Sequence, residues 1–373
     1  MVNKFKAIAD DLRRRLADGE FSDAVAFPSE TSLVRRYGVT RATVRRALAR
    51  LVDEGLIHRH QGAGSRLTPH GCLASGKIGL LFPDRSCIDV FASMVCEILR
   101  VGGRTGYSFA FREITGATSK ARAEETLDAV EDFVRQRVEG VIFRPLVSEA
   151  CEDVNIAVLD RLRVEKTPVV LVDGGVTERK DYDVVGVDNI AAGRQIGDYL
   201  ISLGHKRIAF LLNSLPIGPT GNLRDRMFGV AGAATAAGLS WTAQNVIPCA
   251  DYDVEALRRY FLRCRKVRPD AIVCGSDNVA QSLIRSLVAL GYSVPKDLSV
   301  VGFDDAPYAA RSEPGLTTVR QDFARIGAVA FERLRQRILN PRLEVCALHL
   351  PVELVVRGTT ATRASTRRKG PLS

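Results

Sequence analysis

The stretch YGVTRATVRRALARLVDEGLIHRHQGAGS, residues 37–65, decides the fold of the N-terminal part of the chain. After a turn at Gly38, its apolar residues recur every three to four positions, which is the spacing of an amphipathic helix. Gly55 ends that pattern, and the following residues alternate around Gly-x-Gly, which predicts a β-hairpin. We therefore expect a helix packed against a hairpin. Its predicted inward face is Val44, Ala47, Leu48 and Leu51.

Two more helices are predicted before this one. Residues 4–18 carry apolar side chains at helical spacing. A second helix starts after Ser29, a typical N-cap residue, with Leu33 and Val34 facing inward, and it ends at Gly38. Three short helices followed by a hairpin form the winged helix-turn-helix plan, in which the N-terminal end of the third helix is free to enter a major groove.

The free end of the third helix and the tip of the hairpin carry side chains suited to nucleic acid. Arginine can fork onto guanine, and threonine can contact a phosphate or a base edge. The tip, residues 61–64, has no bulky side chain, so its backbone can approach DNA closely. His58 and His60 lie two positions apart in the hairpin. We expect them to face DNA or solvent as part of a wing; the alternative is that the two bind a metal, although no third ligand is nearby in the sequence. The candidates at the helix end are Thr40, Arg41, Thr43 and Arg45. Thr40 is also the expected N-cap of this helix.

The charge of the chain is concentrated at its two ends. The formal net charge is +10, and residues 1–70 hold 13 basic and 8 acidic residues. Residues 357–373 hold five basic residues and no acidic ones, so they account for the rest of the excess, and the middle is neutral. A basic head on a neutral body predicts that the head binds a polyanion. The basic tail has no periodic pattern of apolar residues, so we expect it to be disordered.

Composition excludes several other classes of protein. No apolar run is long enough to span a bilayer, and the N-terminus lacks the apolar core of a signal peptide, so we expect a cytoplasmic protein without a membrane partner. The eight cysteines form no CxxC pair and lie in apolar segments, which predicts buried free thiols. The sequence has no nucleophile elbow, no phosphate-binding loop and no metal cluster, so we predict no enzyme activity and no cofactor. His205 is expected to cap or pack.

The middle of the chain follows a different pattern. Continuously apolar strands such as KIGLLFPD, VEGVIFRP and DAIVCGSD alternate with helices, which predicts parallel sheets covered on both faces. The number of units exceeds one small sheet, so two doubly wound lobes are expected in an α/β protein. We divide the chain into a DNA-binding head (1–67), a linker (68–76), a two-lobed body (77–356) and a tail (357–373).

Charged residues follow several predicted strands. Ligands of such sheets gather at the carboxyl ends of the strands, so these groups are expected to face one crevice between the lobes. Carboxylates and arginines there suit a sugar, whose hydroxyls both donate and accept. For Asp277, which precedes a helix, N-capping is an equal alternative. The residues are Arg144, Asp173, Asp277 and the pair Asp304–Asp305.

The segment PSETSLVRRYGVTRATVRRALARLVDEGLIHRHQGAGS resembles the DNA-binding domain of GntR-type regulators over about residues 4–67. The resemblance implies double-stranded operator DNA as a partner. It departs at Thr31, where many relatives carry arginine, and in SDAVAFPSE, where Pro-Gly is usual. It implies contacts by Arg41, Thr43, Arg45, Gln61 and Gly62, with Lys4 and Glu30 in support.

The body, with runs such as VPKDLSVVGFDDAPYAARSEPGLTTVRQDF, resembles the effector domain of LacI-type regulators, which is similar to periplasmic sugar-binding proteins. Ser276–Asp277 stands where that family usually has Asn-Asp, and the family's own head and minor-groove hinge helix are absent. The combination resembles a subgroup typified by arabinose-responsive repressors. The implied effector contacts are Phe91, Arg144, Asp173, Arg226, Tyr252, Asp277, Asp304 and Gln321.

These resemblances imply a homodimeric, ligand-responsive transcription regulator, expected to be a repressor controlled by a small sugar. Three alternatives stay open at this point: a purine or other metabolite as the effector, an activating role, and a sugar-binding or sugar-processing protein of another class. The absent signal peptide and the DNA-binding head argue against a transport protein.

Overall fold

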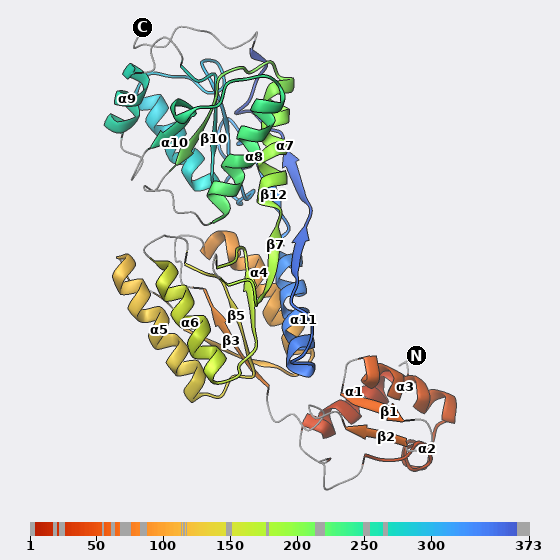
Figure 1. The fold of residues 1–373 in the computed structure, drawn as a ribbon. Coiled ribbons are helices and arrows are strands. Elements are labelled where there is room, and N and C mark those ends of the chain that lie inside the picture. The colour runs from red at the N-terminus through yellow and green to blue at the C-terminus, as the bar shows by residue number, and fades with distance from the viewer. Residues whose placement is uncertain are drawn as a thin grey trace.

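In the computed structural model, the head consists of three helices followed by a two-stranded antiparallel sheet (Figure 1). One apolar core joins them, with Leu12, Leu33 and Leu48 completely buried. The predicted winged helix-turn-helix fold is therefore confirmed. The elements are α1 (Lys4–Ala17), α2 (Glu30–Tyr37), α3 (Arg41–Asp53), β1 (Ile57–His60) and β2 (Gly64–Leu67).

The ends of α2 and α3 lie where the sequence predicted. The Ser29 hydroxyl caps α2 by accepting from the Ser32 amide at 3.2 Å, and Gly38 ends the helix in the left-handed conformation, with φ 61°. The Thr40 hydroxyl accepts from the Thr43 amide at 3.4 Å, at the start of α3. Such capping satisfies backbone groups that the helix itself leaves unpaired.

The structure describes most, but not all, of the chain, and no described helix is long and apolar enough to cross a membrane. The described residues are 4–17, 21, 27–53, 56–60, 64–67, 76–82, 88–112, 114, 116, 118–146, 151–176, 179–212, 221–248, 254–263 and 268–363.

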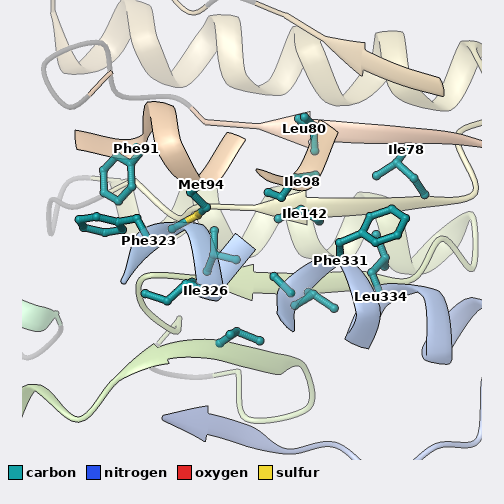
Figure 2. Packing of buried hydrophobic residues seen from close by; sticks show 14 of the residues in the cluster. Ile78, Leu80, Phe91, Met94, Ile98, Ile142, Phe323, Ile326, Phe331 and Leu334 are labelled. Carbon is teal, nitrogen blue, oxygen red and sulfur yellow. The ribbon is translucent and has the colours of Figure 1, made fainter. Parts of the chain in front are cut away.

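Lobe 1 is a six-stranded parallel sheet in the order β13-β7-β6-β5-β3-β4. Alternate strand residues face opposite sides: Leu80 and Ile142 pack with α4 and α11 (Figure 2), whereas Leu81 and Val141 pack with α5 and α6. Its elements are β3 (Lys77–Leu81), α4 (Ile88–Arg104), β4 (Ser108–Phe111), α5 (Ser119–Arg135), β5 (Gly140–Phe143), α6 (Glu152–Val164), β6 (Val169–Val172), β7 (Asp183–Val187), α11 (Phe323–Leu339) and β13 (Ala347–Leu350).

Lobe 2 repeats this plan with a four-stranded parallel sheet in the order β11-β10-β8-β9. Helices α7 and α8 share one core with the sheet, and α9 and α10 share another. The predicted pair of covered parallel sheets is confirmed. The elements are α7 (Asn189–Ser202), β8 (Ile208–Leu212), α8 (Asn222–Ala236), a 3₁₀ turn (Ala243–Asn245), β9 (Val246–Pro248), α9 (Val254–Arg263), β10 (Ala271–Cys274), α10 (Asp277–Ala289) and β11 (Ser299–Val301).

The chain passes between the lobes three times. It leaves lobe 1 after β7, returns from β12 (Thr318–Gln321) into α11, and leaves again from β13 into β14 (Val352–Val355). β12 and β14 pair antiparallel, and isolated bridges join the β12 segment to the β11 edge of lobe 2. These strands form the narrow connection between the two lobes in Figure 1.

The prediction that all cysteines are buried is wrong. Cys151 and Cys274 are buried free thiols, but Cys96 is exposed on α4 and Cys346 is half-buried; the other four lie outside the described residues. The apolar neighbours of Cys96 in sequence belong to a helix, and a helix in contact with a core on one side presents its other side to solvent.

Candidate nucleic-acid interface and ligand site

The N-terminal end of α3 presents an unobstructed arginine beside an oriented one. Arg41 is exposed, and its side chain makes no hydrogen bond or ion pair with any residue that the structure describes. Arg45 donates from Nε to Glu30 Oε2 at 3.1 Å, which ties α3 to the start of α2. The helix N-terminus itself attracts anions through its free amides. This end of α3 can therefore receive a phosphate and present Arg41 to a base edge.

The remaining head residues are placed as follows. Thr40 and Thr43 share a hydrogen bond between their hydroxyls at 3.0 Å, so Thr40 serves first as the cap of α3. Lys4 is exposed at the start of α1. Gln61 and Gly62 lie outside the described residues, as do the side chains of His58 and His60.

In lobe 1, a buried ion pair follows strands β5 and β6. Arg144 Nε donates to Asp173 Oδ2 at 3.2 Å, and both side chains are 7% exposed. The Arg144 guanidinium lies 4.4 Å from the centre of the Phe91 ring, within the range of a cation–π contact. Asp173 has φ 57°, a left-handed conformation that aspartate tolerates better than most residues. Three predicted contacts thus meet at this end of the lobe 1 sheet.

In lobe 2, Arg226 is held on three sides. Its guanidinium carbon lies 3.6 Å from the centre of the Phe303 ring, Nε donates to Asn189 Oδ1 at 2.8 Å, and Nη1 donates to the Gly275 carbonyl at 2.5 Å. Among described residues, Nη2 has no hydrogen-bond partner. The guanidinium is therefore fixed in place with one donor group left over.

Asp304 faces this arginine from the loop after β11. Gln321 Nε2 donates to Asp304 Oδ1 at 2.8 Å, while the buried Gln321 Oε1 has no hydrogen-bond partner in the described structure. Burial raises the pKa of Asp304 to about 7, and Asp173 adds to the rise, whereas Arg226 and Gln321 oppose it. Asp304 has φ 113°, a conformation that non-glycine residues adopt at a cost and that clusters at functional sites.

Charges from both lobes meet here, and we call Arg144, Asp173, Arg226 and Asp304 the inter-lobe cluster. Burial lowers the pKa of Arg226, and Asp304, Asp173 and Arg144 all act on it as neighbouring charges. Asn222 of α8 donates to the carbonyl of Asp173 and, at 3.3 Å, to its Oδ1, so a direct bond joins the lobes at this point.

Asp277 has a different position from the one expected. The N-cap of α10 is Ser276, not Asp277, so the capping interpretation is wrong for this residue. Both carboxylate oxygens are occupied, by the Thr318 hydroxyl at 2.6 Å and the Ala306 amide at 2.7 Å. Burial, reinforced by Asp304, raises its pKa to about 8. Asp277 therefore braces the loop that carries Asp304, and its expected contact with a ligand stays a prediction.

Sequence reasoning missed three residues of this site: Asn189, Asn222 and Phe303. Phe303 lies within the SVVGFDD run, so its position directly before Asp304 carried a signal, whereas the asparagines act through partners distant in sequence. Tyr252 lies outside the described residues. A cavity of about 390 Å³ adjoins Gln321, between the two crossings that flank α11. The described residues contain no group of three metal-binding side chains.

His205 packs, as expected. It is buried, with Nε2 3.0 Å from the Ser299 hydroxyl and Nδ1 3.4 Å from Asp270 Oδ1. This serine–histidine–aspartate arrangement lies under the C-terminal segment, where the Ser299 hydroxyl also accepts from the Ala361 amide at 3.1 Å. With all three side chains buried, it holds that segment to lobe 2. The prediction of a disordered tail from Arg357 onward is therefore wrong for residues 357–363, in which Thr359 is buried and donates to the Val300 carbonyl at 2.7 Å; the rest of the predicted tail lies outside the described residues.

Two family models match the chain. Residues 4–67 match the gntR family of bacterial regulatory proteins, and residues 198–360 match a periplasmic binding protein-like domain. Arabinose metabolism transcriptional repressors of Halalkalibacterium halodurans and Geobacillus stearothermophilus are each 27% identical to this chain; the first alignment covers 98% of both chains, and the second covers 96% of this chain and 97% of the relative.

Solved structures resemble the body. A LacI-family transcriptional regulator from Sanguibacter keddieii has a TM-score of 0.60 at 28% identity, covering 76% of this chain and 99% of that chain. A LacI regulator from Bacillus cereus has a TM-score of 0.65 at 25% identity, covering 78% of this chain and all of its own.

Fold and sites together define a DNA-binding head joined to a two-lobed, ligand-binding body. The chain is a transcriptional regulator that combines a gntR-family head with a periplasmic binding protein-like, LacI-type effector domain.

Proposed function

We propose that this chain is a repressor whose binding to operator DNA is controlled by a small sugar held at the inter-lobe cluster. The observation that carries the proposal is a pair of lobe 2 groups, next to the Arg144–Asp173 ion pair of lobe 1, that have no hydrogen-bond partner among the described residues: Arg226 Nη2 and the second Asp304 oxygen. Arginine donates and carboxylate accepts, and a sugar hydroxyl does both, so a polyol satisfies the two together.

A purine is the second candidate, because a purine repressor of Erwinia tasmaniensis is 31% identical to this chain over 236 residues, 61% of this chain and 65% of that protein. A flat base needs an uncovered aromatic face. Phe91 and Phe303 each have a guanidinium over one face. The arabinose repressors also match over nearly the whole chain, so the sugar is favoured.

The coupling we propose runs through a homodimer in the cytoplasm. Two copies joined through their bodies present two heads to a pseudo-palindromic operator. Sugar binding closes the lobes and shifts the heads. The sugar can change DNA affinity only as far as it binds the two arrangements differently, and DNA changes sugar affinity by the same factor.

A thermal-shift screen of the purified full chain tests the ligand class. A ligand that binds only the folded protein stabilises it by about 2.7 kcal/mol at one hundred times its Kd. We expect pentoses, hexoses or disaccharides to raise the Tm and purines to leave it unchanged. A rise with purines alone would support the second candidate instead, and turnover of a sugar by the pure protein would contradict both.

The head is tested by Arg41→Ala. Losing a forked base contact should weaken binding to a duplex selected from a random pool by about 1–3 kcal/mol, or roughly 5- to 150-fold. Sugar-induced thermal shifts should stay unchanged in this variant, because Arg41 lies in the head. Equal loss of both activities would show a folding defect or a wrong assignment.

A further inference from the structure

The helices of lobe 1 and lobe 2 end in different ways. In lobe 1, the last turns of all four helices contain arginine: Arg104 in α4, Arg135 in α5, two in α6 and Arg337 in α11. In lobe 2, the last turns of α7, α8 and α10 contain no basic residue; the side chain of Arg263, which ends α9, is not among those described.

The residue that follows the helix cap shows a contrast in backbone geometry between the lobe 2 helices and two of the four lobe 1 helices; after α4 of lobe 1, Gly106 is left-handed as in lobe 2. After α7, α8 and α10, a glycine takes the left-handed conformation, at Gly204, Gly238 and Gly291. After α5 and α6, Arg137 (φ 52°) and Lys166 (φ 56°) take it instead. A side chain makes this conformation unfavourable, so the two lobe 1 positions hold long basic residues where glycine would fit with less strain.

These two residues lie at the edge where the linker enters the body. Every strand of lobe 1 is parallel, and each of its helices precedes a strand, so the helices end at the edge where β3 starts at Lys77. Eight residues separate β2 of the head from Gly76, a reach of at most about 30 Å. DNA held by the head is therefore within reach of this edge.

Arg137 and Lys166 are exposed, and neither side chain has an ion-pair or hydrogen-bond partner in the described part of the chain. Most nearby acids are already engaged: Asp132 with Arg112 and Arg135, and Glu165 with Arg161. Glu139, two residues from Arg137, is the exception, because its buried Oε2 has no hydrogen-bond partner among the described residues, and it offsets part of the charge of Arg137. Arg342 is also exposed here, but Glu344 lies two residues away and offsets its charge. The partial negative charge of a helix end, about half a unit, is smaller than the full charge beside it.

We propose that this edge of lobe 1, centred on Arg137 and Lys166, is a second DNA-contacting surface that binds backbone phosphates flanking the sequence read by the head. It rests on the proposed DNA binding of the head and adds contacts by the body. Flexible basic side chains without directional partners fit phosphates, which position a protein without reading sequence. The body is neutral as a whole, but the edge where the linker enters it is locally basic.

The experiment compares matched full-length variants on one duplex. Arg137→Gln/Lys166→Gln removes two charges from this edge, and Lys206→Gln/Lys296→Gln removes two exposed lysines from the opposite end of the body. The probes are a 40-bp duplex selected from a random pool against the wild-type chain and the same site shortened to its protected core. Affinity is measured across salt concentrations.

We expect the edge variant to bind the long duplex about 5- to 50-fold more weakly. The magnitude of the slope of log K against log salt concentration should fall by about 1–2 per protomer. The lysine control should match wild type, and the short duplex should bind all three proteins alike. A third variant, Arg137→Gly/Lys166→Gly, should lose the same DNA affinity while its Tm rises, which excludes misfolding.

Edge and control variants with equal slopes and equal affinities would overturn the second surface while leaving the function of the head intact. The same holds if the edge variants lose binding to the long and short duplexes equally. A wild-type chain that selects no duplex would overturn the proposed function itself.

Discussion

The two halves of the inter-lobe cluster differ in how far their bonding capacity is used within their own lobe. In lobe 1, Arg144 and Asp173 neutralise each other at 3.2 Å and Phe91 covers the arginine. In lobe 2, one Arg226 nitrogen has no hydrogen-bond partner among the described residues, and burial raises the pKa of Asp304 to about 7. Lobe 1 thus presents an ion pair whose charges balance, and lobe 2 presents an arginine and a carboxylate whose hydrogen-bonding capacity is only partly used within that lobe.

This difference indicates an order of events. A ligand gains most from the groups that lack partners, because a buried polar group left unpaired costs free energy that a new bond recovers. We therefore expect lobe 2 to hold the sugar first and lobe 1 to close over it. The Asn222 bond to Asp173 already links the two.

The largest effect is expected from Asp173→Asn, which breaks the buried ion pair of lobe 1. Asparagine keeps the volume and tolerates the left-handed φ, so the change isolates the charge. Leaving Arg144 as an unbalanced buried cation should lower the free energy of unfolding by about 3–5 kcal/mol. Urea denaturation measures this loss. A loss below about 1 kcal/mol would show that Asp173 does not balance the buried charge of Arg144.

Asp304→Asn should raise the free energy of unfolding, in contrast to Asp173→Asn. Because the folded pKa is raised from about 4 to about 7, the wild-type protein loses stability as pH rises between those values and does not recover it above pH 7. The variant should therefore be more stable by about 2–4 kcal/mol at pH 8 and unchanged at pH 4. Melting curves across pH check this. A stability difference between variant and wild type that does not change with pH would show that the pKa of Asp304 is not raised.

Arg226→Lys tests the free donor directly. Lysine keeps the charge but cannot bond Asn189, Gly275 and a ligand at once, because it lacks the planar fork. Affinity for the sugar found in the thermal screen should fall by about 1.5–3 kcal/mol, read by calorimetry. DNA binding without sugar should be retained. Unchanged affinity would remove Arg226 from the site.

Asn222→Ala should have the smallest effect, because it removes one bond between the lobes. We expect sugar affinity to fall by about 0.5–1.5 kcal/mol as the closed arrangement loses that bond. Thr235→Ala on the same helix, whose hydroxyl bonds only within α8, is the control. Equal behaviour of the two variants would show that the bond does not favour closure.

Local features of the fold could be predicted from the sequence. Ser29 and Gly38 mark the ends of α2 because capping depends on residues a few positions apart. The parallel lobes followed from apolar strands alternating with helices, which is also a short-range pattern. Asp173 and Asp304 were identified because polar residues at the carboxyl ends of parallel strands gather at one edge.

Tertiary partners could not be predicted in this way. Nothing near Asp277 in the sequence shows that Thr318, forty-one positions away, takes one of its oxygens. The exposure of Cys96 depends on which side of α4 meets α11, and the left-handed geometry of Arg137 contradicts its residue type. Such features are set by packing between distant segments.

The three passages of the chain between the lobes have a consequence for biosynthesis. Lobe 1 needs α11 and β13, which follow all four strands of the lobe 2 sheet in the sequence, so its sheet is incomplete until Leu350 has been made. The head is complete at Leu67. At about 5–20 residues per second, a nascent chain carries a finished DNA reader for roughly 15–60 s before its sensor can close. Each new molecule therefore passes through a period in which it can engage DNA but cannot yet respond to its ligand.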